Sequence, residues 1–308
     1  MTEAVAILGA NGFVGRHLME RLAERGQPII ALVRSNSRRP FPSGVEVRVS
    51  EFSTPEDFNG ILARSHTIIH AASVSTPGQT AGRPLAELDG NLRLTLALTT
   101  ALQQAPHCRL IYLSSGGTLY GDTHNHPANE NDVLRPRSYY GAGKAASEHF
   151  IHAAAMQFNL AATIFRPSNL YGPGQGLRNG FGIIPTAFDR IQSKTPLTLW
   201  GDGSAVRDYL YIDDFIQLCL KIIDKKESQG TQTLNAAYGH GVSLNDLIDT
   251  ICRITGHPLS IERDASRTVD VARIELDAHA AQRAYGWKAE VSLEEGIART
   301  WRWWKDQA

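Results

Sequence analysis

The first half of the chain alternates short apolar runs with amphipathic stretches. The apolar runs, each as long as a single strand, occupy residues 4–8, 28–33, 67–72 and 110–113, and residues 45–49 alternate apolar and charged residues as a further strand. Residues 16–25 instead place Leu18, Met19 and Leu22 on one side of a helix, and residues 92–102 form a strongly apolar predicted helix. Strands separated by helices pair in parallel through right-handed crossovers, and apolar strands of this kind suit a sheet covered on both faces. The pattern therefore predicts an α/β fold built around a doubly wound parallel sheet.

Further along the chain the pattern changes. Residues 166–185 carry many Gly, Pro and Asn, which is typical of functional loops, and residues 186–308 contain shorter helices and turns. We predict a first domain over residues 1–165, to which segments around 205–237 return, and a smaller α/β substrate domain over residues 166–308.

Composition places this chain of 308 residues in the ordinary globular range, with 42% hydrophobic and 20% charged residues. The 31 basic and 31 acidic side chains give a formal net charge of 0, which argues against nucleic acid as a partner.

Cys108, Cys219 and Cys252 are too widely spaced for a disulfide framework or a zinc motif. No histidine pair has metalloprotease spacing, so we expect no metal. Without a basic leader or an apolar run of roughly 18 residues, we expect a cytoplasmic protein with no membrane partner.

A glycine-rich turn follows the first apolar run. It reads Gly9-Ala10-Asn11-Gly12-Phe13-Val14-Gly15, a G-x-x-G-x-x-G pattern between a predicted strand and a predicted helix. Glycine lets the backbone turn tightly beside a pyrophosphate, and the helix N-terminus offers N–H groups and the positive end of its dipole. A glycine turn without a ligand is the alternative. The context makes the first domain a dinucleotide-binding domain, with contacts from Gly9, Asn11, Gly12, Phe13, Val14 and Gly15.

The choice between NAD and NADP stays open in the sequence. An NAD site usually has an acid at the end of its second strand, to hold the ribose 2′-hydroxyl. Here that strand is followed by Arg34, and Arg38 and Arg39 come soon after. An arginine accommodates the 2′-phosphate of NADP, although a solvated turn explains these residues equally well. Glu51, after the third predicted strand, is placed to contact adenine or its ribose, or is simply a surface acid.

A Y-x-x-x-K pair carries the candidate chemistry. Tyr140 and Lys144 lie on one face of a helix, since residues four apart are neighbours there. An ammonium group favours the phenolate and lowers the pKa of a tyrosine, which makes it a usable general base or acid near neutral pH. Such a pair alone is most often a surface feature. Its place downstream of the glycine turn, and after Ser114 and Ser115 at a strand end, favours a catalytic role.

These motifs together resemble those of the extended short-chain dehydrogenases/reductases, in the NAD-dependent epimerase/dehydratase family and in particular its UDP-glucose 4-epimerase type. The resemblance covers nearly the whole chain, and it is far more specific for the superfamily than for the reaction. The matching blocks are the glycine turn, His70-Ala71-Ala72, Asn91, Ser114 to Gly121, Tyr140 with Lys144, Arg166 to Gly174, Trp200 to Gly203, Arg207-Asp208-Tyr209 and Arg267-Thr268-Val269-Asp270.

The resemblance implies a role for each matching residue. Tyr140 would move a proton on a sugar hydroxyl while hydride passes to or from the nicotinamide, and Lys144 would hold the nicotinamide ribose. Further cofactor contacts would come from Arg34, Glu51, Phe52, Ala71, Ala72, Asn91, Ser114 and Ser168. In the substrate, Asn169, Arg207 and Arg267 would bind the diphosphate. Trp200 would pack on the base, and Asp270 would bond the nucleoside ribose.

One position departs from the family pattern. The family's catalytic Ser or Thr lies five positions before the glycine of the Tyr-Gly pair, and counting back from Gly121 gives Gly116, which has no hydroxyl. Ser115 and Thr118 are therefore equal candidates for this role. Neighbouring side chains of an extended segment point to opposite faces, so Ser115 would need a local shift.

The leading hypothesis is a nucleotide-sugar 4-epimerase of the UDP-hexose type, which binds a nucleotide-diphosphate sugar together with NAD or NADP. An NADPH-dependent nucleotide-sugar 4-keto reductase, such as one acting on a dTDP-4-keto-6-deoxyhexose, is the first alternative. A non-catalytic NAD(P)-binding regulator is the second. The resemblance also implies a homodimer, formed by the Y-x-x-x-K helix and the apolar helix before it.

Overall fold

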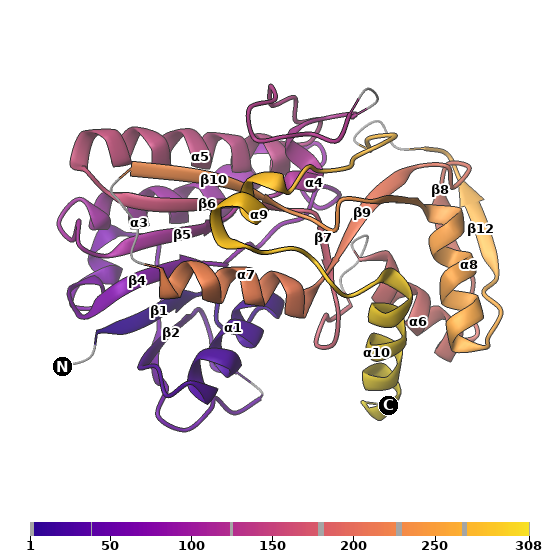
Figure 1. The fold of residues 1–308 in the computed structure, drawn as a ribbon, viewed down its shortest axis with the longest axis horizontal. Helices are drawn as coiled ribbons and strands as arrows, with labels where there is room; N and C mark the ends of the chain where they lie inside the picture. The colour runs from indigo at the N-terminus through magenta and orange to yellow at the C-terminus, as the bar shows by residue number, and fades with distance from the viewer. Residues whose placement is uncertain are drawn as a thin grey trace.

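The computed structural model describes residues 3–37, 39–123, 126–177, 182–225, 230–266 and 270–307 of the chain. Its centre is a parallel sheet of seven strands in the order β10-β6-β5-β4-β1-β2-β3 (Figure 1). The strands are β1 (Ala4–Leu8), β2 (Ile29–Val33), β3 (Glu46–Val49), β4 (Ser65–His70), β5 (Arg109–Leu113), β6 (Ala161–Pro167) and β10 (Gly230–Ala236). The predicted doubly wound α/β fold is confirmed.

Helices cover both faces of this sheet. They are α1 (Phe13–Glu24) and α7 (Ile212–Asp224) on one face, and α3 (Arg93–Leu102) and α5 (Tyr139–Phe158) on the other. Along β1, Val5 and Ile7 pack in the core with α1 and α7, whereas Ala6 and Leu8 pack in the core with α3 and α5. Successive side chains of a strand point to opposite faces, so a continuous apolar run fills both cores.

A smaller lobe lies beyond the carboxyl ends of the main sheet, on the right in Figure 1. It holds the three-stranded sheet β11-β9-β7, the pair β12-β8 and three helices. Their bounds are β7 (Asn169–Tyr171), β8 (Leu197–Trp200), β9 (Val206–Tyr211), β11 (Gly241–Ser243), β12 (Ile261–Asp264), α6 (Ile183–Ser193), α8 (Leu244–Thr255) and α10 (Leu293–Asp306). Trp301 of α10 packs on Phe188 of α6, with 5.0 Å between ring centroids.

Short elements complete the chain. They are the 3₁₀ turns η1 (Pro55–Phe58) and η2 (Leu62–Arg64), the helices α2 (Pro84–Glu87), α4 (Gly116–Leu119) and α9 (His279–Tyr285), and the π-helical turn η3 (Leu88–Leu92). Within the described ranges, no helix combines the length and the apolar character needed to cross a membrane.

The predicted elements are found with small shifts at their ends. α1 begins at Phe13, three residues before the predicted start, because Gly12 supplies an extended N-cap. The apolar helix begins at Arg93, directly after the wide turn η3. The strand expected at residues 67–72 ends at His70, so that the residues after it form a loop.

The proposed boundary at residues 165–166 stays a prediction, and β6 (Ala161–Pro167) runs across it. Segments from the region around 205–237 belong to both sheets. β10 pairs with β6 in the main sheet, and β9 pairs with β7 in the smaller lobe. The chain therefore crosses between the two lobes more than once.

Candidate active site

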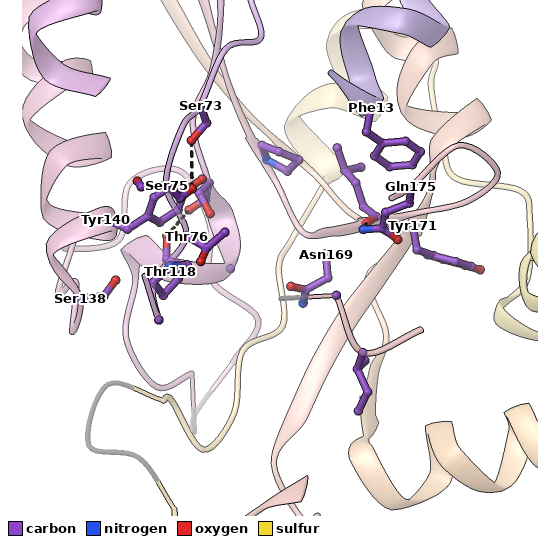
Figure 2. A pocket seen from close by; sticks show the side chains of 18 of the residues that line it. Phe13, Ser73, Ser75, Thr76, Thr118, Ser138, Tyr140, Asn169, Tyr171 and Gln175 are labelled. Carbon is purple, nitrogen blue, oxygen red and sulfur yellow. Dashed lines mark hydrogen bonds between the residues drawn. The ribbon is translucent and has the colours of Figure 1, made fainter. Parts of the chain in front are cut away.

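The carboxyl ends of the parallel strands open into a cleft of about 1660 Å³ that separates the main sheet from the smaller lobe. The order of strands reverses between β1 and β4, and in open α/β sheets ligands bind at such a switch point. Loops after β1 to β5 line one side, while β7, β8 and β9 contribute to the other. Figure 2 shows Tyr140, Thr118 and Thr76 on one side of this cleft, with Phe13 and Gln175 across from them.

The glycine turn after β1 is built for close approach. Gly9 has φ of +89°, and a Cβ there would lie 2.7 Å from the backbone nitrogen of Ala72. A Cβ on Gly15 would overlap the carbonyl of Gly9, so Gly15 brings α1 against the strand rather than lining the cleft. α1 has no side-chain cap, and Gly12 and Phe13 at its start line the cleft. This arrangement fits a dinucleotide pyrophosphate.

The ends of β2 and β3 form the far end of the cleft. Arg34 and Glu51 both line it and are exposed, and no carboxylate side chain stands at the end of β2. The Asn11 side chain donates to the Ser35 carbonyl at 3.0 Å, which ties the glycine turn to this strand end. Phe52 also lines the cleft while its side chain is 1% exposed. This end is open to either cofactor.

The Tyr140–Lys144 pair lies at the start of α5. The Ser138 hydroxyl accepts from the Gly141 N–H at 3.1 Å and caps the helix. Both Tyr140 and Lys144 line the cleft. Lys144 is 4% exposed, its Nζ donates to the Leu113 carbonyl at 2.7 Å, and Nζ lies 5.9 Å from the centroid of the Tyr140 ring.

Burial lowers the pKa of Lys144 to about 8, and the carboxylates of Glu87 and Glu148 act in the opposite direction. An amine that titrates this close to neutral pH beside a phenol is a pair suited to moving a proton.

Two hydroxyls stand near the catalytic candidates. Ser115 is the N-cap of α4, and Thr118 lies one turn on, with its Oγ1 3.5 Å from the Ser115 carbonyl. Both line the cleft, so the choice between them stays a prediction. A Cβ on Gly116 would overlap Leu276 and would lie 2.8 Å from the Arg166 carbonyl. Packing therefore leaves no room for a hydroxyl at position 116.

The loop after β4 adds hydroxyls that the sequence motifs did not single out. Ser73, Ser75 and Thr76 line the cleft, and Figure 2 shows them on the same side of it as Tyr140. Thr76 is 2% exposed, and its Oγ1 has no hydrogen-bond partner in the described part of the chain. The buried Ser114 hydroxyl at the end of β5 also has no hydrogen-bond partner among the described residues. Buried hydroxyls without partners usually bind something, which points to ligands in the cleft.

The substrate side is lined as the resemblance implied, as far as the structure describes it. Trp200, Arg207 and Asp270 line the cleft, and so do Ser168 and Asn169. The Asn169 side chain donates to the Asp208 carbonyl at 3.0 Å, which fixes its orientation. Ala71 and Val14 line the cofactor side. Arg267 lies outside the described residues.

Asn91 differs from its expected place in the cleft lining. It lies in the turn η3, 6% exposed and behind the loop that does the lining. Its side-chain nitrogen donates to the Ser75 hydroxyl at 2.6 Å and to Glu87 Oε1 at 2.9 Å, and its oxygen accepts from the Val74 N–H at 3.0 Å. The wide π turn directs Asn91 into this buried cluster instead of toward the cofactor side.

The fold and the cleft define an enzyme of the Rossmann class that works on a dinucleotide cofactor. Residues 5–237 match the model of the NAD dependent epimerase/dehydratase family, and the chain belongs to that family. This membership confirms the predicted enzyme class at the level of the family.

The chain is similar over its whole length to proteins with two kinds of activity. A putative UDP-glucose 4-epimerase of Methanocaldococcus jannaschii is 27% identical over 307 residues, which are 98% of each chain. A dTDP-4-dehydro-6-deoxyglucose reductase of Escherichia coli is 28% identical over 309 residues, 95% of each chain. The UDP-glucose 4-epimerase of Thermus thermophilus, solved in complex with NAD, superposes with a TM-score of 0.92 at 25% identity, covering 99% of this chain and 100% of the other.

Proposed function

We propose that the protein is a nucleotide-sugar 4-epimerase of the UDP-hexose type. The observation that carries the proposal is the shared cleft onto which the glycine turn, the Tyr140–Lys144 pair and the Ser115 and Thr118 hydroxyls all open. The Methanocaldococcus jannaschii and Thermus thermophilus relatives, both named as UDP-glucose 4-epimerases, support it.

In this mechanism Tyr140 takes the proton of the sugar C4 hydroxyl. A bound NAD would supply hydride chemistry at C4 of the sugar, and the glycine turn and Lys144 would hold it there. Lys144 holds the ribose and stabilises the phenolate of Tyr140, because a nearby ammonium favours that charge. The hydroxyl of Ser115 or Thr118 bonds the same sugar oxygen. Tyr140 finally returns its proton, so the cofactor leaves the cycle unchanged.

The smaller lobe would hold the nucleotide of the substrate. Trp200 would pack on the base, and Asp270 would bond the ribose. Arg207, with Asn169, would bind the diphosphate, for which the fork of a guanidinium is well shaped. Arg267 keeps the same proposed role. The substrate is then a nucleotide-diphosphate sugar, which matches a cleft with arginines at both ends.

The 4-keto reductase remains a second candidate because of the end of β2. Arg34 and Ser35 line the cleft there, where an NAD site usually presents an acid. An arginine at this place suits the 2′-phosphate of NADP, the cofactor that a reductase consumes. The Escherichia coli relative is named as a reductase of this kind.

A homodimer through α3 and α5 is also proposed. The outer face of α5 exposes Phe150 by 49% and Met156 by 84%, and Leu88 next to α3 is 40% exposed. α3 and α5 pack on each other, and a second copy on this side of the sheet would cover the exposed Phe150 and Met156. The free thiols of Cys108, Cys219 and Cys252 suit the reducing cytoplasm, which is the proposed location.

Two measurements test the proposed reaction. First, the purified protein is denatured and the released nucleotide identified; an epimerase should carry NAD. Second, UDP-glucose and UDP-galactose are tested for interconversion without added cofactor. Interconversion supports the epimerase, whereas stoichiometric oxidation of NADPH on a 4-keto sugar would replace it with the reductase.

A further inference from the structure

A buried carboxylate outside the proposed mechanism lies close behind the site. Glu87 ends α2 and is 3% exposed. Its Oε2 accepts from the Ser75 hydroxyl at 2.6 Å, and its Oε1 accepts from the Asn91 side chain at 2.9 Å. Both partners are neutral, and the described residues include no cation within ion-pairing distance of Glu87. A buried carboxylate without a paired cation is costly, which calls for an explanation.

The other side of the carboxylate faces α5. A Cβ added to Gly143 would lie 2.6 Å from Glu87 Oε1 and 2.7 Å from its Cγ. Glycine at this position therefore makes the space that Glu87 occupies. Gly143 directly precedes Lys144, so the carboxylate packs against the helix turn that carries the buried ammonium.

Lys144 needs a negative charge nearby, since burial alone disfavours its protonated form. Glu148 is the other carboxylate that acts on it. Glu148 is already engaged by Arg166, with 2.6 Å between Oε2 and Nη2 and with side chains 2% and 7% exposed. Glu87 is thus the buried carboxylate that acts on Lys144 without forming an ion pair with any cation of the described residues.

The same carboxylate also fixes a loop of the cleft wall. Ser75, its hydrogen-bond donor, belongs to the loop that carries Ser73 and Thr76. The Ser73 hydroxyl donates to the Ser75 carbonyl at 3.3 Å, the contact drawn as a dashed line in Figure 2. A carboxylate that holds Ser75 therefore anchors the loop segment that continues directly into Thr76.

We propose that Glu87 is a positioning residue for the Tyr140–Lys144 site, as the counter-charge of Lys144 and the anchor of the loop 73–76. The expected effect of Glu87 on kinetics rests on the proposed function. The expected interaction of Glu87 with Lys144 does not, because it can be measured in the protein without ligand. The closing experiment is therefore made on the protein without ligand, where it keeps its meaning even if the reaction is a different one.

The test is a double-mutant cycle on unfolding stability, with Glu87→Gln and Lys144→Met, measured at pH 7 and pH 9.5. It is built in a Tyr140→Phe background, because that phenol also faces Lys144. His70 and Tyr112 are the other titratable groups that face Lys144. Burial lowers the pKa of His70 to about 3 and raises the pKa of Tyr112 far above its usual value. Both groups therefore stay neutral from pH 7 to pH 9.5. Glu148 stays paired with Arg166 in every variant of the cycle.

A counter-charge predicts a favourable coupling at pH 7 that is lost at pH 9.5. Lys144 is protonated below about pH 8 and neutral above it, so the charge of Glu87 matters only in the first case. A purely structural Glu87 would give the same coupling at both pH values, and that result would overturn the proposal. The control pair Asp249→Asn with Lys144→Met removes an exposed carboxylate of α8 and should show no coupling at either pH.

Kinetics give a second, independent reading. In Glu87→Gln the alkaline limb of the kcat profile should move to lower pH by roughly 1 unit, since Lys144 loses its proton earlier. An unchanged pH profile of kcat contradicts the role of Glu87 as counter-charge.

If Glu87→Gln does not fold, Gly143→Ala replaces it, because the new Cβ displaces the carboxylate and keeps its charge. The same cycle is then measured with Lys144→Met. A coupling that is unchanged from pH 7 to pH 9.5 overturns the proposal there too.

Discussion

Individual side chains in the cleft differ sharply in what their loss should do. Tyr140 is the proposed proton carrier, and its ring keeps the same packing when the hydroxyl is removed. Tyr140→Phe should therefore reduce kcat by at least about 10²-fold, because proton transfer by a positioned group contributes that much. Cofactor binding, followed by fluorescence or calorimetry, should stay close to the wild type. A variant with full turnover would contradict the assignment of Tyr140.

Ser115 and Thr118 compete for one role. Each lines the cleft, but only the hydroxyl that bonds the reacting oxygen should matter to turnover. Ser115→Ala and Thr118→Ala, measured side by side, should therefore differ in kcat by about 10-fold or more, as expected for one hydrogen bond to a developing charge. Equal effects of the two substitutions would mean that neither residue holds the role alone.

Removal of the Thr76 hydroxyl should affect substrate binding rather than stability. Its buried Oγ1 lacks a hydrogen-bond partner among the residues described, so Thr76→Val removes an unsatisfied group from the protein without ligand. The melting temperature of the Thr76→Val protein without ligand should be unchanged or slightly higher. The KM of the sugar substrate should rise roughly 2- to 10-fold, the worth of one lost hydrogen bond. A loss of stability with unchanged KM would show that Thr76 serves the fold and not the ligand.

His70 should make the protein sensitive to acid. Burial, helped by the charge of Lys144, lowers its pKa to about 3. Between pH 6.5 and 3 the unfolded state takes up a proton that the folded state refuses, so stability falls as the pH drops through this window. His70→Gln should flatten the dependence of the unfolding free energy on pH by up to about 1.4 kcal/mol per pH unit. Urea titrations from about pH 4.5 to 6, inside that window, measure it, with the exposed His107→Gln as control.

Between elements, the contact of α2 with α5 sets the geometry of the site. Gly143 lies inside α5, where alanine would normally be the better helix former by about 1 kcal/mol. Gly143→Ala should nevertheless destabilise the protein, because the new Cβ would lie 2.6 Å from Glu87 Oε1. In a Glu87→Ala background the same substitution should be neutral or stabilising. Ala142→Gly, on the exposed side of the same turn, should cost the same in both backgrounds.

The elements also explain which parts of the site the sequence could predict. Gly9, Gly12 and Tyr140 with Lys144 are local patterns, since each lies within one turn or one helix, and their placement follows from the strand or helix that carries them. Glu87 and Ser75 come together from a helix and a loop that no spacing rule connects. The family resemblance assigned Asn91 to the cofactor side of the cleft, whereas the structure places its side chain in a buried cluster with Ser75 and Glu87.

For the whole molecule, the parallel sheet was predictable because β1, β2, β4 and β5 are apolar runs buried on both faces. β3 is an alternating edge strand, and β6 and β10 were not predicted as strands. The smaller lobe was not predicted in detail, since its strands are three to six residues long and pair with partners distant in the sequence. β9, for example, pairs with β7 and β11, one before and one after it along the chain. Such pairings depend on packing against the main sheet and not on local pattern.

The net charge of 0 also hides how charge is distributed over the molecule. Arg34 lines the cleft at one end and Arg207 at the other, so an overall neutral protein carries cations where we propose that it binds phosphate groups. Ligands that bind only the folded state raise its stability, by about 2.7 kcal/mol at a concentration 100 times Kd. The melting temperature measured with NAD or with NADP therefore reports the affinity for each dinucleotide without any assumption about the reaction.

Arg34 should separate the two cofactors in that measurement. Because we propose that Arg34 contacts the 2′-phosphate of NADP, Arg34→Ala should reduce the rise in melting temperature produced by NADP and leave the rise produced by NAD nearly unchanged. Arg39 bonds the Gln307 side chain and does not line the cleft, so Arg39→Ala should alter neither shift. Equal losses for NAD and NADP in Arg34→Ala would mean that the guanidinium contacts a part common to both, and the argument for a reductase from the end of β2 would fall.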